Sequence, residues 1–208
     1  MTDKLADVRA DLAFMRGLAA GDETPSHSLG LVLFVCGGLY AVQTFIQYLS
    51  FGGHVDLPRL ADLAVVVIAN AGVLGTIVTV TMRDWSKGPK TLSGRAYEAA
   101  FIAAGLINLC LVVIFGLMSY RTGSAEPWLV HAEVVFALFG GTWFIAFRLR
   151  RRLWQGAVSL GWFAAAILLA VNGVNNRFLL ITSLALLLLM SLPGYLLMRA
   201  ARPTQAKA

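Results

Sequence analysis

Three ionisable side chains interrupt long apolar stretches of this 208-residue chain: Asp62, His131 and Glu133. A charge inside a membrane is costly, so ionisable residues there usually pair with a neighbour, bind a ligand or carry a proton. Counted from predicted helix starts at Pro58 and Pro127, all three lie about 5 to 9 Å from the same membrane surface. They are therefore the first candidates for a ligand or proton site.

The spacing of these residues limits what they can do together. His131 and Glu133 cannot form an acid–base pair, because residues two apart on a regular helix point in nearly opposite directions. Glu133 shares its helix face with the small residue Gly140, which predicts a helix interface with a polar network around the carboxylate. Asp62 follows Arg59 by three residues, so an ion pair along one helix is the simpler interpretation. One histidine with these carboxylates is weak evidence for a metal, and no metal site is predicted.

Three amides form a second group of ligand candidates. Gln43, Asn70 and Asn108 lie on three different predicted helices, each within about one turn of the bilayer centre by helical rise. They could cluster around a transported polar solute. Hydrogen bonding between helices, worth about 0.6 kcal/mol on average, is the simpler role and the one the sequence favours.

The chain lacks the sequence motifs of common catalytic and cofactor sites. It has no Gly-x-Ser-x-Gly nucleophile turn, no His-Glu-x-x-His pair and no phosphate-binding loop. A haem held by two histidines would need a second histidine inside a span besides His131. The sequence therefore favours a protein without catalytic residues or cofactor.

Composition shows which elements must position these side chains. Hydrophobic residues make up 58% of the chain, charged residues 13%, and the mean hydropathy is +0.74, whereas soluble domains carry about 25% charged residues. The net charge of +6 does not indicate nucleic-acid binding, because the basic residues lie between apolar runs. The composition predicts an all-α integral membrane protein with the lipid bilayer as its surroundings.

Six apolar runs each approach the ~20 residues that a helix needs to cross ~30 Å of hydrocarbon. They predict one transmembrane domain at residues 28–199, a bundle of six transmembrane helices followed by a cytoplasmic tail at 200–208. The predicted spans are residues 29–51, 58–82, 96–120, 127–147, 153–171 and 178–198. Aromatic residues near span ends, Tyr97 among them, are expected to anchor the helices at the membrane surface.

The positions of the basic residues predict the orientation. Of the seventeen Lys and Arg residues, fourteen lie in the two terminal segments and the connections 83–95 and 148–152. The other three connections hold one arginine each. Because cytoplasmic loops are enriched in Lys and Arg, both termini are predicted to be cytoplasmic.

Residues 1–27 are predicted to be a cytoplasmic segment that contains a short amphipathic helix, from about Leu5 to Ala19, before the first span. Leu5, Val8, Leu12 and Met15 recur every three or four residues and so share one helix face. This face could lie on the membrane, pack against the protein's own cytoplasmic loops, or dock a partner protein.

Small residues four apart let transmembrane helices approach closely. Ala71 with Gly75 and Gly161 with Ala165 are two such pairs. They predict close packing within the bundle, and they would serve a homo-oligomer equally well.

The stretch from Asp11 to Arg16, DLAFMR, resembles the opening of a group of uncharacterised bacterial inner-membrane proteins with several spans. The resemblance covers about ten residues and implies a bacterial inner membrane, but no activity. Our leading hypothesis is an interaction, sensory or accessory membrane protein. The alternative is a small-solute or lipid transporter that uses Asp62 and Glu133 with the three midplane amides.

Overall fold

Helices make up every regular element of residues 27–84, 92–124, 126–173 and 175–201, the part of the chain that the computed structural model describes. Six helical stretches are long and apolar enough to cross a membrane. An α-helix hydrogen-bonds its own backbone, as lipid requires. The all-α fold class and six helices long and apolar enough to span a membrane are thus confirmed. The elements are α2 (His27–Phe51), α3 (Arg59–Asp84), α4 (Leu92–Thr122), α5 (Glu126–Arg150), α6 (Leu153–Asn172), α7 (Asn176–Leu186), the π-helix η1 (Leu187–Ser191) and α8 (Leu192–Ala200).

The predicted spans match these helices closely. Five of the six lie wholly within a helical stretch, and Pro58 directly precedes α3. Pro127 is the second residue of α5, where a missing amide hydrogen costs nothing. The amphipathic helix predicted within residues 1–27, with Leu5, Val8, Leu12 and Met15, lies outside the described residues.

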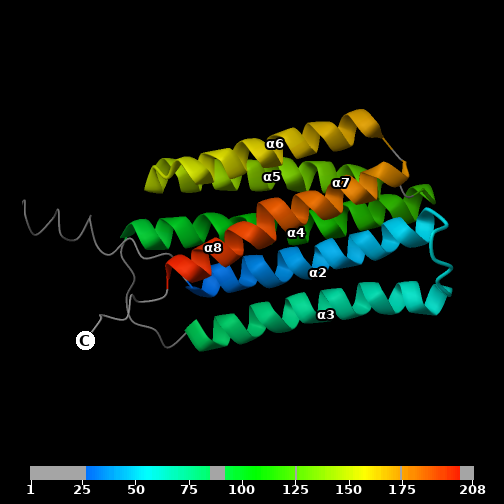
Figure 1. Cartoon of the computed structure of the whole chain (residues 1–208), viewed down its shortest axis with the longest axis horizontal. Coiled ribbons are helices and arrows are strands. Elements are labelled where there is room, and N and C mark those ends of the chain that lie inside the picture. Colours follow the sequence, from blue (N-terminus) through cyan, green and yellow to red (C-terminus); the bar gives the residue numbers. More distant parts are fainter. Residues whose placement is uncertain (1–26, 85–91, 125, 174, 202–208) are drawn as a thin grey trace, which may run out of the picture.

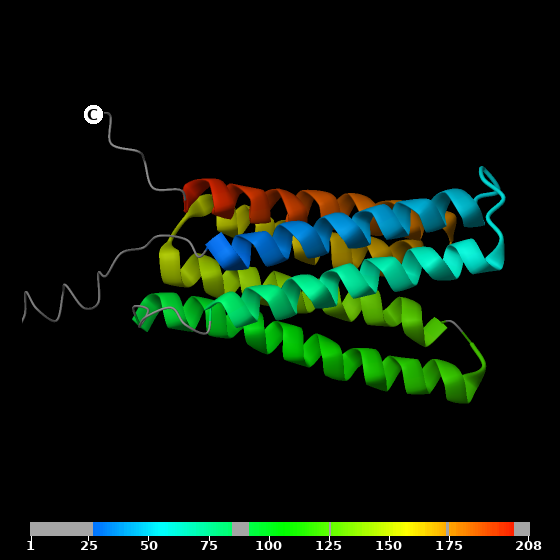
Figure 2. The same cartoon turned by 90° about the horizontal axis from the view of Figure 1, so that it is seen from below.

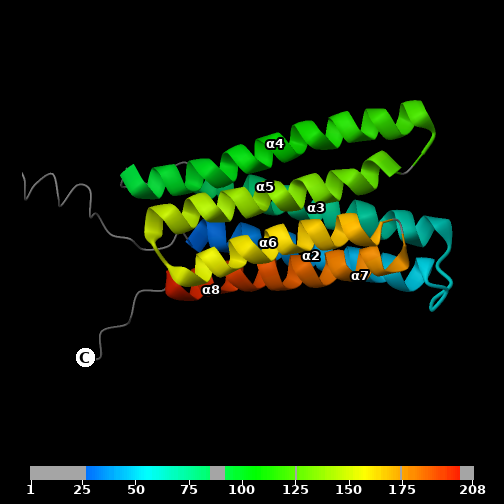
Figure 3. The same cartoon turned by 90° about the horizontal axis from the view of Figure 1, so that it is seen from above.

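The helices pack as an open arc in the order α3, α2, the α7–α8 span (residues 176–200), α6, α5 and α4. In Figure 1, α5 and α6 lie along one side of the bundle and α2 and α3 along the other. Seen from above, α4, α5, α6 and α8 follow one another (Figure 3). α3 packs mainly against α2 and α4 mainly against α5, so the two ends of the arc each have one principal neighbour.

The described chain begins and ends at the same end of the bundle (Figure 1). The start of α2 and the end of α8 lie beside the turn that joins α5 to α6. We call this the arginine end, because residues 148 to 152, at the end of α5 and in the turn, include four arginines. The turns that follow α2, α4 and α6 lie at the opposite end (Figure 2).

Large side chains fill the centre of the arc. Trp143, Trp162 and Leu169 are fully buried. α2 and α8 approach at backbone distance, since a Cβ atom on Gly194 would lie 2.4 Å from the amide nitrogen of Phe34. Dispersion between closely packed backbones is a main source of helix association in lipid.

The two predicted small-residue pairs behave differently. Gly161 packs against the α7–α8 span, where a Cβ atom would lie 2.6 Å from a methyl carbon of Leu189, and Ala165 is buried. Ala71 and Gly75 are exposed, and a Cβ atom on Gly75 would meet nothing within 4 Å. The prediction of close packing within the bundle is therefore confirmed for the first pair and wrong for the second.

The π-helix η1 interrupts the α7–α8 span just before Pro193. A regular helix would bond the carbonyl of Leu189 to the amide at position 193, and proline has no amide hydrogen. The indole Nε1 of Trp162, on α6, donates a hydrogen bond to this carbonyl at 3.1 Å. A buried side chain of one helix thus donates to a carbonyl whose usual helical donor is missing at Pro193.

Candidate functional site

His131 is a residue of α5 that faces α4, near the end of the bundle opposite the arginine end. Its ring stacks on Trp128 at 4.9 Å between centroids and meets Phe115 of α4 at 5.7 Å. Its Nε2 atom is buried and has no hydrogen-bond partner among the described residues. The aromatic contacts hold the ring in place and leave one nitrogen unsatisfied.

Asp62 and Glu133 do not join His131 in one site. Asp62 lies in the first turn of α3, which packs against α2, whereas α5 packs against α4 and α6. One carboxylate oxygen of Asp62 is buried without a hydrogen-bond partner in the described part of the chain, and the side chain of Arg59 lies outside that part. Glu133 is half-buried and forms no hydrogen bond or ion pair with any described residue. The polar network expected around Glu133 is therefore absent from these residues.

The three midplane amides also remain separate. Tyr40 donates its hydroxyl hydrogen to Oδ1 of Asn70 at 3.1 Å, and Nδ2 of Asn70 donates to the carbonyl of Val66 at 2.8 Å. The predicted hydrogen bond between helices is therefore present for Asn70. Gln43 Oε1 and Asn108 Oδ1 are buried and have no partner in the described ranges. A cluster of the three amides is not formed.

Polar residues that the sequence analysis left out bind the helices together. Each donates to a backbone carbonyl of a neighbouring helix, a bond typically worth about 0.6 kcal/mol in membranes. The serine donors are Ser159 to Gly140 at 2.8 Å, Ser183 to Ala41 at 2.9 Å and Ser191 to Phe34 at 3.1 Å. Serines inside apolar runs were the available signal, but a serine also bonds its own helix, so sequence does not identify the acceptor.

A polar and aromatic cluster lies toward the arginine end. Gln155 is fully buried and donates through Nε2 to the hydroxyl oxygen of Tyr97 at 3.3 Å. The guanidinium carbon of Arg150 lies 3.9 Å from the centre of the Tyr97 ring, a cation–π contact. Tyr97 is 1% exposed, so its expected role as a surface anchor is wrong. It joins α4 to α5 and α6 instead.

Comparison with protein-family models, with curated proteins and with solved structures finds no match for this chain. The resemblance of residues 11–16 to bacterial inner-membrane proteins stays a prediction. A function must therefore be argued from the arrangement of the chain's own residues.

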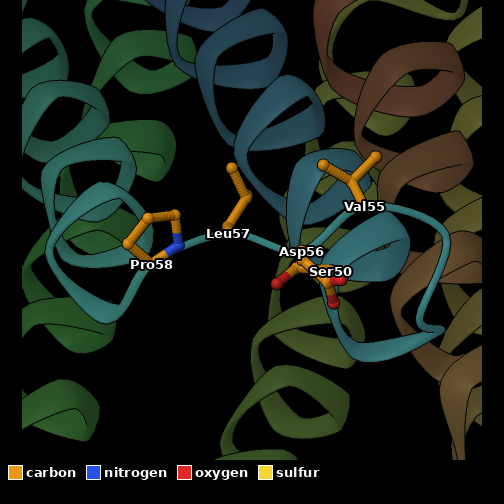
Figure 4. A pocket seen from close by; sticks show the side chains of 5 residues that line it. All are labelled: Ser50, Val55, Asp56, Leu57 and Pro58. Carbon is orange, nitrogen blue, oxygen red and sulfur yellow. The ribbon is translucent and has the colours of Figure 1, made fainter.

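Two surface hollows lie at the ends of the bundle. The hollow at the opposite end has a volume of about 390 Å³ and is formed by the end of α2 and the loop that leads to α3 (Figure 4). Asp56 and Ser50 are its polar residues, and Asp62, His131 and Glu133 do not line it. The hollow at the arginine end has a volume of about 340 Å³ and is lined by Phe147, Arg148, Arg151 and Leu153.

The arrangement separates the polar groups into bonded and unbonded sets. The serines and Trp162 hold helices together in the centre, and Gln155 does so toward the arginine end. The buried atoms without a hydrogen-bond partner among the described residues are spread over the helices from α2 to α7. Among the described residues no three His, Cys, Asp or Glu side chains are placed to hold a metal ion. The hollow at the arginine end is the one that combines positive charge with apolar walls.

Proposed function

We propose that this chain is an interaction or accessory protein of a bacterial inner membrane, that both its termini are cytoplasmic, and that it acts by binding. The observation that supports this is the filled centre of the arc. Trp143, Trp162 and Gln155 each have 0% of their surface exposed, so side chains occupy the space that a transport route through the bundle would need. The groups free to bind lie at its ends and outer faces.

The distribution of Lys and Arg supports a cytoplasmic arginine end. α2, the first described helix, starts at that end (Figure 1). We propose that residues 1–26 contain an amphipathic helix whose apolar face, with Leu5, Val8, Leu12 and Met15, docks a membrane or cytoplasmic partner protein.

Co-purification after crosslinking in the native membrane tests this function. The tagged full-length protein should retain a partner that is lost when residues 1–20 are deleted. Leu5→Ser with Leu12→Ser should give the same loss, whereas Asp7→Ser, on the polar face, should not. Unchanged partners and phenotype in the deletion variant would exclude the proposed role of this segment.

Small-solute or lipid transport is the second candidate. The supporting observation is that several buried polar atoms have no hydrogen-bond partner among the described residues, among them Gln43 Oε1, Asp62 Oδ1, Asn108 Oδ1 and His131 Nε2. A buried unsatisfied polar atom costs about 1 to 3 kcal/mol, which a bound solute could offset.

A thermal-shift screen against solutes and lipids tests the second candidate. A ligand at one hundred times its Kd stabilises the folded protein by about 2.7 kcal/mol and raises its Tm. Asp62→Asn and Glu133→Gln should each abolish that shift or its dependence on pH. A Glu133→Gln protein with transport and pH dependence intact would remove Glu133 from the candidates.

A further inference from the structure

The hollow at the arginine end has one cationic side and one apolar side. Arg148 and Arg151 supply the charge, and Phe147 and Leu153 supply the apolar walls. Both arginines are exposed, and Leu153 is 82% exposed. The hollow therefore opens to the surroundings at the level where a predicted span meets the membrane surface.

The two arginines of the hollow are free to bind an anion. In the described part of the chain neither forms an ion pair, whereas the neighbouring Arg150 is held against the ring of Tyr97. α6 begins at Leu153, and Arg152 makes no side-chain hydrogen bond to its first turn. The amide groups of that turn add positive potential to the charge of the arginines.

The apolar walls favour a ligand that is not wholly polar. The Phe147 ring packs against α6, where a Cβ atom on Gly156 would lie 3.3 Å from it. One wall is thus held in place by the adjacent helix. A free phosphate or a soluble phosphate ester would use the arginines and leave both walls without a partner.

The backbone at Arg151 is unusual for a residue with a side chain. Its φ angle is +50°, in the left-handed region, where a Cβ atom crowds the following carbonyl. Glycine would adopt this turn at lower cost. Strained residues of this kind gather at binding sites, where the side chain has a role that offsets the strain.

From these observations we infer that the hollow binds an anionic phospholipid. The guanidinium groups of Arg148 and Arg151 contact the phosphate, and Phe147 and Leu153 contact the upper part of the acyl chains. Basic pockets at the cytoplasmic ends of transmembrane helices suit such headgroups. The proposed orientation places the lipid in the inner leaflet, but binding itself depends neither on that orientation nor on a docked partner.

Native mass spectrometry of the full-length protein in mild detergent tests this inference. Dioleoyl phosphatidylglycerol is the anionic probe and dioleoyl phosphatidylcholine is the neutral one with the same chains. Near a membrane surface one Lys or Arg contributes about five-fold to the binding of anionic lipid. Arg148→Gln should therefore weaken phosphatidylglycerol binding about five-fold, and Arg148→Gln with Arg151→Gln about 25-fold.

Arg199→Gln is the matched control. Arg199 is exposed at the end of α8, at the same end of the bundle but outside the hollow. It should leave phosphatidylglycerol binding unchanged. An equal loss in Arg199→Gln would mean a diffuse positive surface, and equal binding of the two lipids would mean no anion site. Either result overturns the inference.

Two further measurements complete the test. Millimolar glycerol 3-phosphate should not displace phosphatidylglycerol, and full displacement would identify a soluble phosphate ester as the ligand. If the double Gln variant melts at a lower temperature, Arg148→Gln with Arg151→Gly replaces it, because glycine accepts the turn. A folded variant of this kind with undiminished binding overturns the inference. The partner test uses residues 1–20 only, so the two proposals fail separately.

Discussion

Replacing Trp162 by phenylalanine should destabilise the protein both by reducing its packing and by removing a donor to a backbone carbonyl. Trp162 is fully buried, and its indole nitrogen donates to the carbonyl of Leu189 at 3.1 Å. Pro193 cannot supply the amide that a regular helix would provide. Phenylalanine keeps an aromatic ring in the packing site but removes the donor.

The magnitude follows from two contributions. A partial truncation of a packed side chain costs about 1 to 2 kcal/mol. Hydrogen bonds between membrane helices contribute about 0.6 and at most about 1.7 kcal/mol, and a stranded buried carbonyl costs up to about 3 kcal/mol in the least favourable case. Trp162→Phe should therefore lower the free energy of unfolding by about 2 to 4 kcal/mol.

Trp143→Phe is the matched control for the packing contribution. Trp143 is also fully buried and also contacts two aromatic rings, but its indole nitrogen has no hydrogen-bond partner among the described residues. The same change of volume there should cost about 1 to 2 kcal/mol. The difference between the two variants contains the hydrogen bond of Trp162 together with the gain from removing the buried, unpaired N–H of Trp143.

A double-mutant cycle with Pro193→Ala isolates the bond further. Alanine restores an amide at position 193, so the cost of Trp162→Phe should fall by about 1 kcal/mol in that background, and the cost of Trp143→Phe should not change. Unfolding in mixed micelles, followed by circular dichroism as dodecyl sulfate is added, measures these free energies. Equal costs for the two tryptophans, or a coupling below about 0.3 kcal/mol with Pro193, would refute the reasoning.

The remaining predictions use the same unfolding measurement. Gly194→Ala should lower the free energy of unfolding by about 1 to 3 kcal/mol, because its Cβ atom would lie 2.4 Å from a backbone nitrogen of α2. Gly75→Ala should leave that free energy unchanged or raise it by up to about 1 kcal/mol, because nothing lies within 4 Å of the added Cβ atom. Ser159→Ala should cost about 0.6 to 1.7 kcal/mol by removing its bond to α5, and no loss would show that the bond is weak. Arg151→Gly should raise the free energy of unfolding by up to about 1 kcal/mol, because glycine adopts the φ angle of +50° at lower cost. A decrease would mean that contacts of the arginine side chain stabilise the protein by more than the backbone strain costs.

Hydropathy predicted the spans because each transmembrane helix must form its own backbone hydrogen bonds and match the thickness of the bilayer, whatever its neighbours are. The boundaries at Pro58 and Pro127 came from the missing amide hydrogen of proline. Neither argument involves a second helix. The sequence therefore predicted where the chain crosses the membrane and left open which helices pack together.

The candidate residues were less predictable for the same reason. Position along a helix gives depth, and Asp62, His131 and Glu133 do lie toward one end, but depth does not give direction. Tyr97 has the depth of a surface anchor and is buried because α5 and α6 close over it. The hydrogen bond from Trp162 to Leu189 joins residues 27 positions apart and has no local signature.

The open arc also determines how the bundle comes apart. α3 is held mainly by α2, so it can separate after losing one principal interface, whereas α6 is held by α5 and by the α7–α8 span. Segments with few buried contacts open at lower free energy than the rest of a protein. The helices at the two ends of the arc, α3 and α4, are thus the ones that can separate from the bundle and pack against another helix in the membrane while the centre remains folded.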